Sequence, residues 1–175
     1  GDRFNACRLF ALAGEGGTMI CSQAESPEIP HAPLPYAEET KPGFEYAFAA
    51  ELIQHGKPDL ARRIVKAVRD RHNGSNRNPW NECECGSSYI RSMAAHSLQL
   101  AASGYRCDLS AGRLEFAPAV PGDFRCFWSC GAAWGVFSRS ANESVLHVLG
   151  GTLHLREMKF DELAHPVNRI LRAGE

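Results

Sequence analysis

The sequence predicts a mainly α chain, in which helices are followed by a small antiparallel β-segment, and which is a fragment of a larger domain. Three observations predict this. Apolar residues recur with helical spacing over residues 43–104, whereas after residue 105 the apolar period changes to two. The chain also opens inside an apolar patch, ACRLFALAG, and not on Met, which indicates a cut within a longer protein.

Residues 1–42 are predicted to form a Gly/Pro-rich loop segment. GTMICS has the composition of a short strand, but SPEIPHAPLPYAEETKPG is dense in proline. Proline lacks a backbone donor and interrupts regular structure, so this stretch is expected to be an extended loop. A long ordered loop inside a compact domain is often functional.

Residues 43–104 are predicted to hold three helices. The first spans 43–56, and its apolar residues at helical spacing are Phe44, Ala47, Phe48, Leu52 and Ile53. The second spans 57–72, begins near Pro58, and carries Leu60, Ile64, Val65 and Val68 on one face. The third spans 87–105, is capped by Ser87 or Ser88, and stops at Gly104.

Residues 105–160 are predicted to form the C-terminal β-segment. Strand composition recurs in GRLEFAPAV, DFRCFWSC and AAWGVFSRS. SVLHVLGGTLHLREM is predicted to be a hairpin, with Gly150 and Gly151 in a primed turn. The tail, residues 161–175, is expected to be a short helix or frayed.

Composition excludes several function classes. The net charge of −1 gives no overall field that points to nucleic acid or to an anionic membrane, and the basic stretch within residues 57–77 is interpreted as a solvated helix face. Apolar runs are shorter than the roughly 20 residues of a spanning helix. Seven cysteines are an odd number, which favours a reduced, cytoplasmic protein.

The stretch RNPWNECECGSSYIRSM, residues 77–93, is the densest in chemically useful side chains. Cys83 and Cys85 lack the usual C-x-x-C spacing of a zinc site, and Cys126 and Cys130 fall on a predicted strand. No metal or cofactor is therefore expected.

The two acids of this stretch, Glu82 and Glu84, lie roughly 6.5 Å apart if the chain is extended, a separation compatible with glycosidase carboxylates. Acids on one short loop, however, rarely flank a sugar from both sides. The alternative is that one of the two faces solvent.

Arg91 lies near the start of the third predicted helix and is expected to have a partner, because an unpaired buried charge is costly. Glu82 is the natural partner. The pair either fastens the loop to the helix, or both groups point into a pocket where they hold a sugar, with Trp80 as an apolar face. His96 is interpreted as a packed or exposed helix residue.

These motifs resemble a known family. PYAEETKPGFEYAFAAELIQHG, AVRDRHNGSNRNPWNECECGSSYIRSMAAHSLQLAASGY and FWSCGAAWGVF, in this order, are similar to the C-terminal part of glycoside hydrolase family 116, which includes bile acid β-glucosidase. The block RNPWNE-x-ECG-x-x-Y-x-RSM is the most specific element. The likeness runs over about residues 17–160.

The resemblance implies a retaining β-glucosidase or glucosylceramidase built on an (α/α)6 toroid, with residues 43–104 as part of its catalytic domain. It places both catalytic carboxylates upstream, so no catalytic residue is expected in this chain, and the isolated fragment is expected to be inactive. It assigns glucose binding in the −1 subsite to Glu82 and Arg91. The implied partners are a β-glucoside or glucosyl lipid substrate and the missing N-terminal part of the same enzyme.

The sequence also departs from the family. Lys41 and Pro42 stand where the family has a Trp and a Thr, and that Trp lines the glucose site. Lys41 cannot supply an aromatic platform. A non-catalytic carbohydrate-binding or interaction module of the same fold is therefore the alternative.

Overall fold

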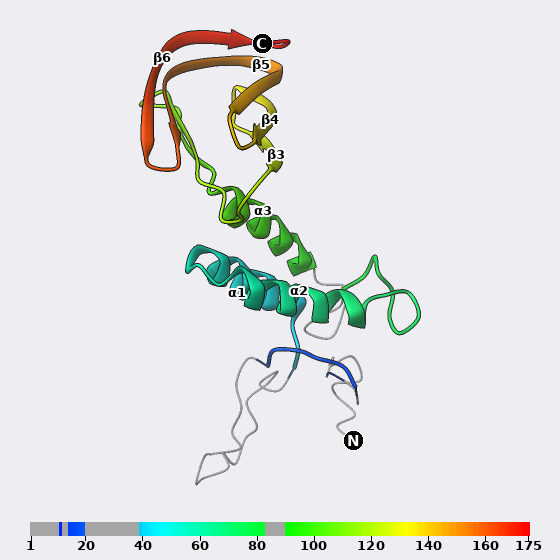
Figure 1. Ribbon diagram of the computed structural model, residues 1–175. Helices are drawn as coiled ribbons and strands as arrows, with labels where there is room; N and C mark the ends of the chain where they lie inside the picture. Colours follow the sequence, from blue (N-terminus) through cyan, green and yellow to red (C-terminus); the bar gives the residue numbers. More distant parts are fainter. Residues whose placement is uncertain (1–10, 12–13, 20–38, 83–89) are drawn as a thin grey trace, which may run out of the picture. The chain divides into compact units, whose positions relative to one another are not determined.

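The computed structural model describes residues 11, 14–19, 39–82 and 90–175. The chain divides into two compact units, Gly1–Leu98 and Gln99–Glu175 (Figure 1). The described part of the first unit is helical, and the second is built on a β-sheet. None of the helices in the described ranges is long and apolar enough to cross a membrane.

Two helices form the body of the first unit, α1 (Pro42–Gln54) and α2 (Pro58–Arg71), and they pack side by side (Figure 1). Each begins with a proline in its first turn, where the missing backbone donor costs nothing. The short connection between them contains Gly56. Both predicted helices are confirmed to within two residues.

The buried face of α1 is not the face that its large apolar residues suggest. Its buried side chains are those of Glu45, Tyr46, Ala49 and Ala50, whereas Phe44 and Phe48 are about half exposed (48% and 47%). Ala61 and Val68 are buried on α2. Small alanines allow two helices to approach closely, so the alanine face packs inward and the phenylalanines face outward.

The third predicted helix is broken in two. A 3₁₀ segment, η1 (Ile90–Ala95), leads into the shorter helix α3 (His96–Ser103), which stops before Gly104 as predicted. Ser87 and Ser88, the predicted caps, lie outside the described residues.

The prediction of a mainly α chain is wrong, because a mixed six-stranded sheet is the largest element. Its strands are β1 (Arg106–Asp108), β2 (Arg113–Phe116), β3 (Phe124–Ser129), β4 (Ala133–Arg139), β5 (Ser144–Phe160) and β6 (Leu163–Arg172). Their order is β1-β2-β5-β4-β3, with β6 also paired to β5. The sheet is not purely antiparallel, since β2 runs parallel to β5. The tail is neither helical nor frayed but forms β6.

No hairpin turn forms at Gly150 and Gly151, contrary to prediction. β5 runs through both glycines, pairing with β4 up to Gly151 and with β6 from Thr152 onward, and it curves strongly along its length (Figure 1). A Cβ at Gly150 would lie 2.4 Å from the Trp134 ring nitrogen, and Gly151 has φ +81°. The pair therefore makes room for Trp134 and bends the strand without reversing it.

One hydrophobic core joins the strands of the second unit. Phe116 stacks on Phe137 with ring centroids 4.1 Å apart, and Phe160 stacks on Phe137 with centroids 5.6 Å apart. Trp128 is 1% exposed within the same cluster, which also contains Leu114, Val148, Leu153, Leu155 and Met158. Apolar residues from five strands thus close one core.

Replacing Gly151 by Ala tests the bend in β5. A Cβ there would meet the Ala132 carbonyl oxygen at 2.2 Å, and the positive φ disfavours any side chain. Gly151→Ala is expected to lower the free energy of unfolding in urea by about 2 kcal/mol or more. Gly131→Ala, where no atom lies within 4 Å of the new Cβ, serves as the control; an equal effect of both substitutions contradicts the account.

Candidate functional site

Glu82 is the site residue whose surroundings are best defined. Its side chain is only 6% exposed. One oxygen, Oε1, accepts a hydrogen bond of 2.7 Å from the Tyr46 hydroxyl and one of 2.6 Å from Arg69 Nη1. Tyr46 belongs to the buried face of α1, and Arg69 lies in the last turn of α2. Glu82 is therefore held by both helices.

Asparagine side chains shape the loop after α2, and this loop leads the chain back to the helices. Asn73 Oδ1 accepts hydrogen bonds of 2.9 Å from the backbone amides of Ser75 and Asn76. Asn78 Oδ1 accepts one of 2.9 Å from the Trp80 amide. Such side chain-to-backbone hydrogen bonds stabilise tight turns. Glu82 therefore follows a loop whose turns are held by hydrogen bonds.

The electrostatics favour a neutral Tyr46 beside the Glu82 carboxylate. Burial, and then the hydrogen bond and negative charge of Glu82, raise the pKa of Tyr46 well above its usual value. The phenol therefore keeps its proton and donates it. Both donors use Oε1, and no described residue donates a hydrogen bond to Oε2 of Glu82. We call Tyr46, Arg69 and Glu82 the carboxylate clasp.

The structure describes only some of the other residues predicted for this site. The backbone of Arg91 lies in η1, but its side chain is outside the described part of the structure, so the Glu82–Arg91 pair remains a prediction. Cys83, Glu84 and Cys85 also fall outside the described residues. Trp80 is 92% exposed, and no group of three or more potential metal ligands occurs among the described residues.

Lys41 lies at the N-cap of α1, directly before Pro42. Its side chain is 6% exposed, with Nζ 3.9 Å from Glu39 Oε2 and 5.7 Å from the centroid of the Phe44 ring. Glu39 is completely buried. A paired, buried ammonium thus occupies this position.

Sequence reasoning missed a second buried pair, Glu45 with Arg71. Two nitrogens of Arg71 donate hydrogen bonds to the two Glu45 oxygens, and the side chains are 1% and 2% exposed. Arg71 Nη1 also donates to the Gly16 carbonyl at 2.6 Å, and the Thr18 amide donates to Glu45 Oε1 at 2.8 Å. The only signal in the sequence was an acid inside the apolar run GFEYAFAA.

An apolar groove of about 460 Å³ is lined by α1, α2 and residues 16–18. Phe48, Leu52, Leu60 and Ile64 line it, together with Arg63. Tyr46 lies roughly 200° around the helix from Phe48. The groove and the carboxylate clasp therefore use opposite faces of α1.

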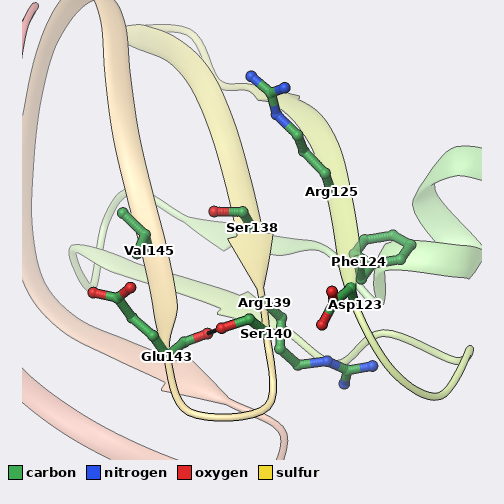
Figure 2. Close-up of a pocket in the computed structure, with 8 residues that line it drawn as sticks. All are labelled: Asp123, Phe124, Arg125, Ser138, Arg139, Ser140, Glu143 and Val145. Atoms are coloured by element: carbon green, nitrogen blue, oxygen red, sulfur yellow. Dashed lines mark hydrogen bonds between the residues drawn. The ribbon is translucent and has the colours of Figure 1, made fainter.

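The second unit has a hollow of about 310 Å³ at the ends of β3, β4 and β5, shown in Figure 2. Its two arginines, Arg125 and Arg139, point in different directions (Figure 2). Arg139 donates to the carbonyls of Val120 and Gly122 at 2.6 and 3.3 Å. This arginine holds a loop in place, and the lining side chains do not converge on one ligand.

No protein-family model matches the sequence, and no curated protein matches it. The likeness to family-116 enzymes therefore depends on the motifs quoted above and remains a prediction. The proposed function therefore depends on the residues and contacts described above.

The buried Glu45–Arg71 pair is expected to be essential for the stability of the first unit. Glu45→Gln keeps the side-chain shape but leaves the Arg71 charge buried without its counterion, so we expect a loss of about 3 kcal/mol in the free energy of unfolding. Asp59→Asn, which removes the exposed pair with Arg62, should change it little. Urea titration of both variants tests this, and equal small effects would refute it.

Proposed function

We propose that this chain is the sugar-holding part of a β-glucosidase-like glycoside hydrolase, in which Glu82 accepts hydrogen bonds from glucose hydroxyls. The observation that carries the proposal is the one-sided use of the Glu82 carboxylate. Oε1 is fixed by Tyr46 and Arg69, while no described residue donates to Oε2. A carboxylate held in this way has an oriented acceptor for a ligand.

A fixed acceptor suits a sugar hydroxyl. Hydrogen bonds to a charged acceptor are stronger than those between neutral groups. A carboxylate that is already ordered loses little side-chain entropy when the ligand binds. Arg69 also partly neutralises the Glu82 charge, which lowers the cost of keeping it away from water.

Arg91 completes the proposed sugar wall. It follows Glu82 by nine positions in the block that resembles family 116, and the family's glucose ligands occupy both positions. Its planar guanidinium would donate hydrogen bonds to hydroxyls, whereas Glu82 would accept them. One donor and one acceptor group can then bind neighbouring hydroxyls of the same ring.

The reaction would be hydrolysis of a β-glucoside or a glucosyl lipid by two-step displacement with retention. The nucleophile and the acid/base would come from upstream sequence of the same enzyme, and this chain would hold the glucosyl group in position for them. No cofactor is involved in such a step. The cysteine content favours a cytoplasmic enzyme.

Lys41 favours the second candidate, a non-catalytic carbohydrate-binding module. Its buried ammonium, which is paired with Glu39, gives no flat apolar face for a sugar ring. Hydrolysis of a β-glucoside by the protein that contains this chain and its upstream sequence would favour the enzyme. Glucose binding without hydrolysis would favour the module.

Glu82→Gln tests both candidates in that longer protein. Loss of the charged acceptor is expected to weaken glucose binding about 10- to 100-fold, because a hydrogen bond to a charged group contributes about 1.5–3 kcal/mol. Isothermal titration with glucose or a β-glucosidase inhibitor measures this. Glu51→Gln, an exposed carboxylate of α1, is the matched control and should bind normally. Unchanged affinity in a folded Glu82→Gln protein would rule out the sugar site.

A further inference from the structure

The apolar groove of the first unit has the dimensions of a small-molecule site. Its lining side chains on the two helices are apolar except for one arginine, and the apolar ones are Phe48, Leu52, Leu60, Ile64 and Ala67. From Leu60 to Ala67 the helix rises roughly 10 Å. The volume of about 460 Å³ lies in the range of pockets that hold small ligands.

The apolar lining continues beyond this groove along α1. A neighbouring hollow of about 310 Å³ shares Phe48 with it and adds Met19, Phe44 and Glu45, whose charge is already paired on the inner side. Because Phe44, Phe48 and Leu52 follow one another at intervals of one helical turn, they form a stripe along the helix. Met19, Phe44 and Phe48 are each about half exposed. Such a long apolar stripe in contact with water suits a ligand that is itself a chain.

The arginine that lines the groove is the α2 cation without a counterion among the described residues. Arg63 is exposed, and it forms no hydrogen bond or ion pair with any other described residue. Each of the other basic residues of α2 is paired with an acid: Arg62 with Asp59, Lys66 with Asp70, Arg69 with Glu82, and Arg71 with Glu45. The charge of the groove is therefore positive, and it is complementary to an anion.

A ligand that matches both features has an apolar chain and one anionic group. We propose that the groove binds a fatty-acid anion, with its acyl chain along the apolar stripe and its carboxylate on Arg63. The planar guanidinium matches a carboxylate with two parallel hydrogen bonds. Burial of the chain supplies most of the affinity, about fourfold for each methylene group.

This fatty-acid site is separate from the proposed sugar site. The groove and the carboxylate clasp use opposite faces of α1, as described above. A fatty acid in the groove is therefore a second ligand and not the lipid part of a glucoside held by Glu82. The inference does not depend on the proposed function, and glucose binding can fail while fatty-acid binding succeeds.

The test is isothermal titration of the whole chain with sodium decanoate, below the concentration at which it forms micelles. Saturable binding is expected, and octanoate, with two fewer methylene groups, should bind about 15-fold more weakly. Decyltrimethylammonium, which has the same chain length and the opposite charge, should bind more weakly than decanoate.

Two variants with matched controls separate the charge from the apolar lining. Arg63→Gln should weaken decanoate binding about fivefold, the contribution of an exposed ion pair, and should remove the preference over decyltrimethylammonium. Arg62→Gln, at the neighbouring arginine that is paired with Asp59, should bind as the wild type does. Leu60→Ser should weaken both ligands, whereas Leu100→Ser, at a similarly exposed leucine of α3, should weaken neither.

Four results would overturn the proposal. The first is no saturable binding of decanoate by wild-type chain whose circular dichroism shows that it is folded. The second is an equal loss of affinity in Arg63→Gln and Arg62→Gln, since the carboxylate would then not lie on Arg63. The third is binding to vesicles of phosphatidylcholine and phosphatidylserine without binding of decanoate, because the occupant would be a membrane. The fourth is a dimer that Leu60→Ser dissociates and decanoate does not, because the occupant would be a second copy of the chain.

Discussion

A single carboxylate oxygen, Glu82 Oε1, joins the two helices of the first unit to the loop that follows them. It accepts hydrogen bonds from Tyr46 on α1 and Arg69 on α2. Each such bond to a charged group contributes about 1.5–3 kcal/mol, and loss of either donor leaves a buried charge less compensated. The position of the loop, and hence the proposed sugar wall, depends on this oxygen.

The clasp is possible because α1 and α2 meet through small side chains. Ala49 and Ala61 are almost fully buried at 0% and 1% exposure, so the helices approach closely and the polar atoms at the edges of their interface come within hydrogen-bonding distance. The same approach buries Glu45 beside Arg71. The described part of the first unit thus combines small-residue packing with paired charges.

Local signals in the sequence predicted the local elements. Pro58, Gly56 and Gly104 mark helix ends, and the alternating stretches after residue 105 became β2, β3 and β4. Predictions from local signals were wrong where contacts between residues far apart in the sequence determine the structure. Gly150 and Gly151 look like a turn, but Trp134 and the neighbouring strands of β5 make them a bend. The sequence of the tail does not alternate between apolar and polar residues. It nevertheless forms β6, because it pairs with β5.

The same distinction applies to the candidate site. Glu82 could be selected from its motif, because an acid beside Trp80 and near Arg91 is unusual. Its partners could not, since Tyr46 and Arg69 lie 36 and 13 positions away and neither belongs to a pattern of its own. The burial of Lys41 could not be predicted from the sequence either, because it depends on contacts with Glu39 and Phe44 at the start of α1.

The most direct test of the clasp is a double-mutant cycle with Tyr46→Phe and Glu82→Gln, in which glucose affinity is measured by isothermal titration. The account predicts that Tyr46→Phe weakens glucose binding about 10-fold when Glu82 is present, because the carboxylate loses one of the two donors that orient it. It predicts no further loss from Tyr46→Phe once Glu82→Gln has been made. Equal losses in both backgrounds, or no loss in either, would contradict the claim that Tyr46 acts on the sugar through Glu82.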